Sequence, residues 1–133
     1  MTRRESRKHL FLLLFQRDFY ETEEYANQIE IYCQEHGVQD GRDKEYIKLR
    51  LASLVSHLSE IDDLIEENAK GWKLDRIAKA ELSILRVAVF EAVFDEGIPV
   101  GVAINEAVEL SKEYGGDHAP SFVNGILGKI VNE

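Results

Sequence analysis

The stretch that decides the fold class is residues 99–114, PVGVAINEAVELSKEY, where a strand competes with a helix. Val100, Val102 and Ile104 alternate with other residues, as apolar side chains do along a half-buried strand. A second apolar stripe has helical spacing and comprises Ala103, Ala107, Leu110 and Tyr114. Because this second stripe runs through the whole stretch, we predict a helix here and an all-α fold.

Helix-breaking residues mark both ends of this stretch. Pro99 suits the first turn of a helix, because its missing N–H would have no intrahelical partner there. Gly115 and Gly116 are typical of a helix end. Asp117 is then the expected N-cap of a last helix. Its inward residues are expected to be Phe122, Val123, Ile126, Leu127 and Ile130.

The rest of the chain also repeats apolar residues at helical spacing, which predicts about seven helices in all. They are expected from the amino terminus to about residue 16, and over residues 23–36, 44–57, 59–67, 74–94, 99–114 and 117–130. Ser59 and Asp62 resemble a capping box at the start of the fourth helix. Val93 is expected on the buried face of the fifth.

Size and composition predict one domain, residues 1–133, because 133 residues with 44% hydrophobic content can pack one core. The longest apolar run, residues 10–15, is much shorter than the roughly 20 residues that span a bilayer. No signal-peptide cleavage site follows that run. We therefore expect a cytoplasmic protein without membrane contact. The single cysteine, Cys33, cannot form an internal disulfide and is expected in the core.

Positive charge is concentrated in residues 3–8, although the chain has a formal net charge of −9. The cations of this basic cluster are Arg3, Arg4, Arg7 and Lys8. Glu5 is the one acid among them. A basic segment on an acidic protein indicates a local site for a polyanion, because the remaining surface repels nucleic acid. A charged terminus that only aids solubility would give the same pattern, and the sequence favours neither the polyanion site nor the solubilising terminus.

Residues that could carry catalysis or hold a metal are scattered. The histidines, which have no partner at ligand spacing, are His9, His36, His57 and His118. Asp62 and Glu66 stand four residues apart, which is more typical of a solvated acidic face than of a shared proton. Trp72 is expected to pack in the core at a helix junction. We therefore predict a binding protein, not an enzyme, with no metal and no cofactor.

A set of short motifs in the second half of the chain resembles the NusB family of bacterial transcription antitermination factors. The matching pieces are residues 84–91, Pro99, residues 102–112, 114–115 and 122–129, in the order and spacing of the family. The segment Arg4-x-x-Arg7, ahead of a long apolar helix, matches as well. Residues 21–75 match only as helices of suitable length. The resemblance therefore covers the whole chain in architecture and about half of it in motif.

The resemblance implies a compact bundle of two helical subdomains, here roughly residues 1–70 and 74–133. It also implies binding of the boxA segment of nascent RNA as a single strand. A further implied partner is NusE, a small-subunit ribosomal protein, with which the family joins RNA polymerase and suppresses termination, chiefly on ribosomal RNA operons. Some members of the family form homodimers through the RNA-binding face.

Carried over by position, the family's RNA-binding residues are Arg3, Arg4, Arg7, Lys8, Ser121 and Phe122. The cations would contact phosphates, and free N–H groups at the start of the last helix would offer a second anion site. Phe122 is left open between a stacking ring and a core residue, because it shares the helical stripe of Ile126. His118, Ala119 and Pro120 replace more polar residues of the family, which leaves the RNA contacts there open.

The residues expected at the NusE contact are Glu81, Phe15 and Arg76. An acidic residue at position 81 suits a basic ribosomal protein. Phe15 stands where a tyrosine is common, and Leu82 stands where a polar residue is frequent.

Two other functions compete with an antitermination factor. A NusB-like domain also occurs fused to RNA cytosine methyltransferases, but this chain lacks the catalytic cysteine motif of those enzymes. A homodimeric helical scaffold, whose basic end only aids solubility, is the second alternative.

Overall fold

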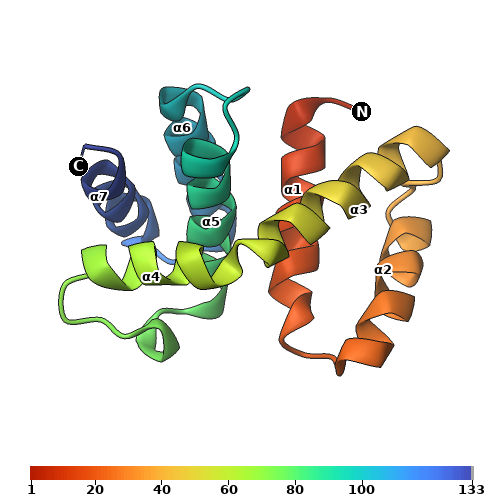
Figure 1. Ribbon diagram of the computed structural model, residues 1–133, viewed down its shortest axis with the longest axis horizontal. Coiled ribbons are helices and arrows are strands. Elements are labelled where there is room, and N and C mark those ends of the chain that lie inside the picture. Colours follow the sequence, from red (N-terminus) through yellow and green to blue (C-terminus); the bar gives the residue numbers. More distant parts are fainter. Residues whose placement is uncertain (133) are drawn as a thin grey trace. The chain divides into compact units, whose positions relative to one another are not determined.

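The computed structural model describes residues 1–132, among which it has seven α-helices and no strand (Figure 1). The α-helices are α1 (Arg3–Arg17), α2 (Thr22–Glu35), α3 (Gly41–Ser56), α4 (Leu58–Asn68), α5 (Lys79–Val89), α6 (Val100–Tyr114) and α7 (Ala119–Val131). A 3₁₀ turn, η1 (Leu74–Arg76), precedes α5, and a π-helical turn, η2 (Phe90–Phe94), follows it. The predicted all-α class and the predicted helix after Pro99 are confirmed.

The chain divides into two compact units, Met1–Val55 and the residues from Ser56 onward. The sequence placed the division between the halves near residues 70–74. The structure has it before α4, because α4 packs against α5 and α7.

In the first unit, α1 supplies the largest part of the core. Its buried apolar side chains are Leu10, Phe11, Leu13 and Leu14. Tyr32 and Cys33 of α2 are buried as well, so the expected core position of Cys33 is confirmed. The Tyr25 hydroxyl donates a hydrogen bond of 2.6 Å to the Leu13 carbonyl oxygen, which ties α2 to α1.

Local chemistry explains where the helices of the first unit begin and end. Thr2 caps α1, since its hydroxyl oxygen accepts the Glu5 N–H at 3.0 Å. Gly37 has a φ of 72°, the left-handed conformation expected of a residue that follows a helix. α3 begins at Gly41, three residues before the predicted start at residue 44. There the Asp40 carboxylate accepts the Arg42 N–H at 2.8 Å.

Three aromatic rings are packed together between α1 and α2. The Tyr32 hydroxyl and His9 Nδ1 lie 2.7 Å apart, within hydrogen-bonding distance. The His36 ring stacks on the Tyr32 ring with their centroids 3.9 Å apart. Burial of His9, together with the nearby His36, lowers the pKa of its imidazole from the ordinary 6.5.

In the second unit, α5 is the central helix and contacts α4, α6 and α7. Its buried residues are Leu82, Ser83, Ile84, Leu85, Val87, Ala88 and Val89. Arg86 interrupts this run and forms a two-pronged ion pair with Asp62 of α4. Its Nε and Nη2 atoms donate to the two Asp62 carboxylate oxygens at 2.8 and 3.0 Å. Asp62 is therefore a structural ion-pair partner and not part of a purely solvated acidic face.

Three details of the predicted helices are wrong in this unit. The expected helix over residues 74–94 is broken at Ile77 and Ala78, whose extended backbone separates η1 from α5. Val93 is 44% exposed, because a π turn rotates each residue less than an α turn and shifts the buried face. α4 begins at Leu58 after His57 without a side-chain cap, so the capping box at Ser59 does not form.

We predict that Asp62→Ala lowers the free energy of unfolding by roughly 2 kcal/mol, because it leaves the largely buried Arg86 guanidinium without its carboxylate. Urea denaturation followed by circular dichroism measures this. Asp63→Ala is the matched control, since Asp63 is the exposed neighbour and should change stability by about 0.5 kcal/mol or less. Equal losses in both variants would show that the ion pair adds nothing.

We also predict that acid weakens the folded state through His9. The folded pKa lies below the unfolded value of 6.5, so the unfolded chain binds the proton more readily. The melting temperature should therefore fall as the pH drops below about 6.5 towards the folded pKa. His9→Gln should reduce this fall between about pH 7 and 5.5, measured by thermal denaturation. An unchanged pH profile in that variant would assign the effect to other groups.

Candidate nucleic-acid interface

The basic cluster lies on the first two turns of α1, and its four members differ in exposure. Arg3 and Arg4 are exposed, and Lys8 is half-buried. The Arg7 side chain is only 6% exposed. The cluster therefore presents three cations to solvent rather than four.

Arg7 is buried because it lies on the apolar stripe of α1. It precedes Leu10, Phe11 and Leu14 by three, four and seven residues, and all three are core residues. Because the Arg7 guanidinium lies within the core, we expect it to stabilise the packing of α1 rather than to contact nucleic acid. The helical spacing that places Arg7 inward was already readable in the sequence.

The junction between α6 and α7 positions the start of the last helix. Gly115 ends α6, and a Cβ atom there would collide with the Ala119 methyl group and lie 2.8 Å from the Ser111 carbonyl oxygen. Ala119 is buried at the first position of α7. Glycine at 115 therefore permits the close approach that sets where α7 begins.

The start of α7 differs from the prediction that Asp117 caps it. His118 occupies the N-cap position, and its side chain makes no capping hydrogen bond. The Ala119 N–H is bonded to the Gly116 carbonyl oxygen at 3.0 Å, and Pro120 has no N–H. The expected anion site at free helix amides is therefore reduced, and the exposed Ser121 is the donor that this turn still presents.

An open cavity of about 290 Å³ lies beside the start of α7. We call it the aromatic cavity. Its lining residues come from three elements and the turns between them: Trp72, Arg76, Ile77, Ala78, Glu81, His118 and Phe122. Apart from Arg76, Glu81 and His118, these residues offer apolar or aromatic surface.

Trp72 and Phe122 form an edge-to-face pair at this cavity, with centroids 6.2 Å apart and an interplanar angle of 74°. Trp72 is 51% exposed, so the prediction that it packs in the core is wrong. Phe122 is half-buried at the cavity wall, and its ring packs against the indole of Trp72. The sequence signal for Trp72 was its isolation: a large aromatic residue outside any apolar stripe and next to Lys73.

The predicted partner-binding residues are divided between the two units. Glu81, in the first turn of α5, and Arg76, in η1, line the same aromatic cavity as Phe122. Phe15 belongs to α1 of the other unit, where its ring packs near those of Phe11 and Phe19. The structure thus brings Glu81, Arg76 and Phe122 together.

Among residues 1–132, no three side chains of His, Cys, Asp or Glu cluster in a way that could hold a metal ion. None of the helices in that range combines the length and the apolar composition needed to cross a bilayer.

Comparison with known proteins gives a consistent result over the full length. A model of the NusB family matches residues 4–132. A transcription antitermination protein NusB from Lachnoclostridium phytofermentans is 46% identical over 132 residues, which cover 99% of this chain and 100% of that protein.

Solved structures agree with the sequence match. The T. maritima NusB structure has a TM-score of 0.86 at 34% identity, covering 100% of this chain and 92% of that one. A crystal structure of the antitermination factors NusB and NusE in complex with double-stranded RNA contains a chain with a TM-score of 0.82. That chain is 29% identical, and the match covers 98% of this chain and 96% of that one.

Proposed function

Because this chain belongs to the NusB family, we propose that it is a transcription antitermination factor that binds boxA RNA together with NusE. In this function the pair joins RNA polymerase and suppresses termination, chiefly on ribosomal RNA operons. The protein acts by binding and carries out no catalysis, and its place of action is the cytoplasm, where nascent RNA is made.

Two kinds of relative support the proposed partners. The similar protein from L. phytofermentans carries the name of an antitermination protein, and the similar solved complex holds NusE and RNA. That complex contains double-stranded RNA, whereas we propose a single strand as the functional ligand. Binding of a single strand and of a duplex with the same sequence distinguishes these two forms of RNA.

The observation that carries the proposal is the exposed Trp72 ring, held edge-to-face by Phe122 at an open cavity. Unpaired bases stack on aromatic side chains, and such stacking contributes about 1–3 kcal/mol per base. Arg76 at the same cavity can neutralise a phosphate or stack on a base. Ser121, exposed one residue before Phe122, adds a hydroxyl for hydrogen bonding.

The amino end of α1 supplies the phosphate contacts of the proposal. Arg3, Arg4 and Lys8 reach solvent, while Arg7 holds α1 in place from within the core. Cations on a helix can position a strand by its phosphates, but phosphate contacts carry little sequence information. Base recognition is therefore assigned to the aromatic cavity and to NusE.

Glu81 is the residue we assign to NusE. Its carboxylate lines the aromatic cavity and suits a basic ribosomal protein, whereas it repels the phosphates of RNA. Arg76 and Phe15 are proposed as further contacts of the same partner. Because Glu81 and Phe122 share one cavity, NusE and RNA would meet there, which offers a physical reason for binding them together.

We predict that a boxA-containing single strand binds with a salt slope of about −2 in a plot of log affinity against log salt. Each of the three cations of the basic cluster that reach solvent contributes about 0.7. Arg4→Glu should lower the affinity at least tenfold at low salt, because it replaces an attraction to phosphate by a repulsion. Fluorescence anisotropy of labelled RNA measures both, with a duplex of the same sequence for comparison.

Glu81→Lys changes the charge in the opposite direction. It should raise the affinity for RNA alone, because it removes a carboxylate that repels phosphate, and it should weaken the complex with purified NusE. Wild-type protein that forms no complex with micromolar RNA, with or without NusE, would contradict the proposal. Unchanged RNA binding in a folded Arg4→Glu variant would favour the scaffold with a merely solubilising terminus.

A further inference from the structure

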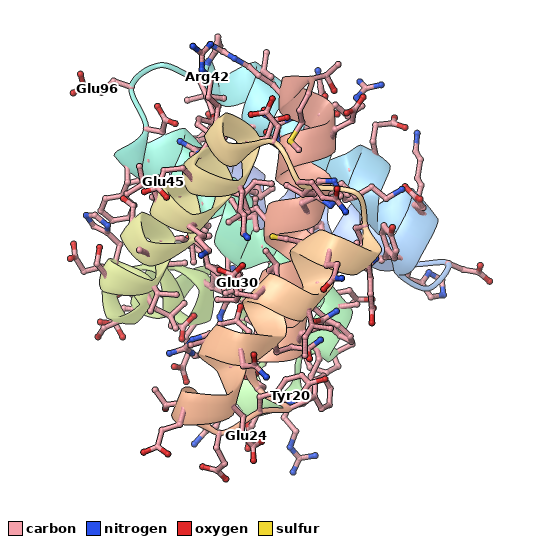
Figure 2. All side chains as sticks on the ribbon, turned by 90° about the vertical axis from the view of Figure 1, so that its right-hand side faces the viewer. Tyr20, Glu24, Glu30, Arg42, Glu45 and Glu96 are labelled. Carbon is pink, nitrogen blue, oxygen red and sulfur yellow. The ribbon has the colours of Figure 1, made fainter. Side chains whose placement is uncertain are left out.

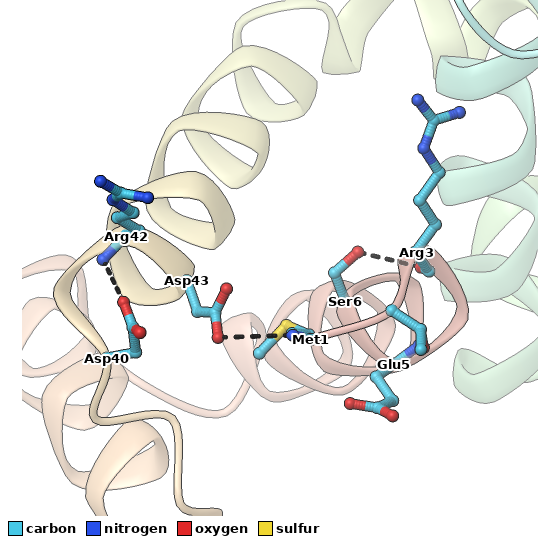
Figure 3. Close-up of polar contacts among 8 residues, drawn as sticks. Met1, Arg3, Glu5, Ser6, Asp40, Arg42 and Asp43 are labelled. Carbon is cyan, nitrogen blue, oxygen red and sulfur yellow. Dashed lines mark hydrogen bonds and ion pairs between the residues drawn. The ribbon is translucent and has the colours of Figure 1, made fainter.

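A second cavity, in the first unit, points to an extension of the RNA site. It has a volume of about 380 Å³ and lies between the amino end of α1 and the amino end of α3 (Figure 3). We call it the α1–α3 groove, and its main lining residues are Thr2, Arg3, Ser6, Arg42, Asp43 and Tyr46. We propose that bound RNA continues from the basic cluster into this groove and contacts Arg42 and Tyr46. This inference rests on the proposed RNA-binding function.

The two arginines of the groove have guanidinium groups available for an anion. Arg3 and Arg42 are both exposed, and among residues 1–132 neither guanidinium has a carboxylate partner. Of the nearby hydroxyl groups, Ser6 donates to the Arg3 carbonyl oxygen at 2.9 Å, whereas Thr2 accepts the Glu5 N–H and keeps its own hydrogen to donate. The groove therefore offers two guanidinium groups and hydroxyl donors beside them, and cationic donors bind phosphate more strongly than neutral ones.

Tyr46 gives the groove an aromatic surface. Its ring is 46% exposed, although the helical spacing of α3 places the neighbouring Ile47 in the core. The Arg50 guanidinium lies 5.9 Å from the centroid of the Tyr46 ring, one turn further along α3. That cation steadies the ring from its own helix and leaves part of it open to a stacked base.

The carboxylates closest to the groove, Asp40 and Asp43, have partners of their own, and other acidic side chains point away from it. Figure 3 shows the Glu5 carboxylate pointing away from the side on which the Arg3 and Arg42 guanidinium groups lie. Figure 2 shows Glu24, near the start of α2, at the opposite end of the unit from Arg42. Asp43 is within the groove, but its carboxylate lies 3.8 Å from the amino-terminal ammonium group of Met1. Among the lining residues, Arg3, Arg42 and the amino terminus of Met1 are cationic and Asp43 is the one acid, while Asp40 accepts the Arg42 N–H at 2.8 Å beside them.

The same residues favour RNA over an acidic peptide as the occupant. Asp43 repels the carboxylates of an acidic peptide and the phosphates of RNA alike, but a base can donate its amino hydrogens to that carboxylate, which an acidic side chain cannot do. A stacking ring beside two arginines is the combination that single-stranded nucleic acid uses. Arg3 lines the groove and also belongs to the basic cluster, so one strand can contact both without a gap.

The test compares two labelled RNA strands: boxA alone, and boxA extended by about four to eight unstructured nucleotides at either end. Wild-type protein should bind an extended strand about tenfold more tightly. Tyr46→Ala should remove most of that gain, and Arg42→Ala should reduce it about threefold and lower the salt slope by about 0.7. Neither variant should change the affinity for boxA alone by more than about twofold. A carboxyl-terminal tag keeps the amino terminus native.

Two controls match these variants. Tyr20→Ala removes a partly exposed tyrosine at the other end of the same unit, as Figure 2 shows. Lys112→Ala removes an exposed cation from α6, where it pairs with Glu109 at 3.2 Å. Both controls should retain the full gain from the extended strand, and thermal melting should confirm that all four variants fold.

The outcomes separate this inference from the proposed function. If the wild type binds boxA but gains nothing from either extension, or if Arg42→Ala and Tyr46→Ala behave like the controls, the groove does not bind RNA and the inference is overturned. If these variants instead weaken only the binding of NusE or of an acidic peptide, the groove belongs to a protein partner and the inference is again overturned. If no strand binds at all, the proposed function itself fails.

Discussion

The burial of α5 is the constraint on which the second unit depends. A helix that is apolar on nearly every side must be surrounded by other helices, and α4, α6 and α7 meet this need. Arg86 is the polar exception, and its ion pair with Asp62 joins α5 to α4 where apolar contact is interrupted. Because α5 is enclosed, its first turn and the start of α7 are held in fixed positions, and the aromatic cavity forms between them.

The proposed functional surfaces are formed by side chains that are not packed into the core. Trp72 stands in the turn after α4, outside any apolar stripe, and its indole therefore reaches solvent beside Phe122. In the first unit Arg7 is buried in the core, whereas Arg3 and Arg4 of the same helix are exposed. The protein thus combines a strongly negative overall charge with two small sites that suit RNA: one cationic, the other largely aromatic.

Helical spacing predicted the fold class and most of the helices. The apolar stripe of each helix lies within one segment of sequence, so it can be recognised without knowing which other helix packs against it. Boundaries set by single hydrogen bonds or by a change of helix type were not predictable in that way, as the start of α4 at Leu58 and the π turn at Val93 illustrate. The residues of the aromatic cavity come from different elements. Their meeting depends on the Gly115 junction and on the break at Ile77, which no local pattern reveals.

Trp72 is the only tryptophan in the chain, so its fluorescence reports directly on whether RNA occupies the aromatic cavity. We predict that acrylamide quenches the free protein efficiently, since the indole is exposed at that cavity. Saturation with single-stranded boxA RNA should change the emission and protect the indole from the quencher, because a base covers it. If anisotropy shows that the RNA binds while the emission and quenching of Trp72 remain unchanged, the bases do not enter the aromatic cavity.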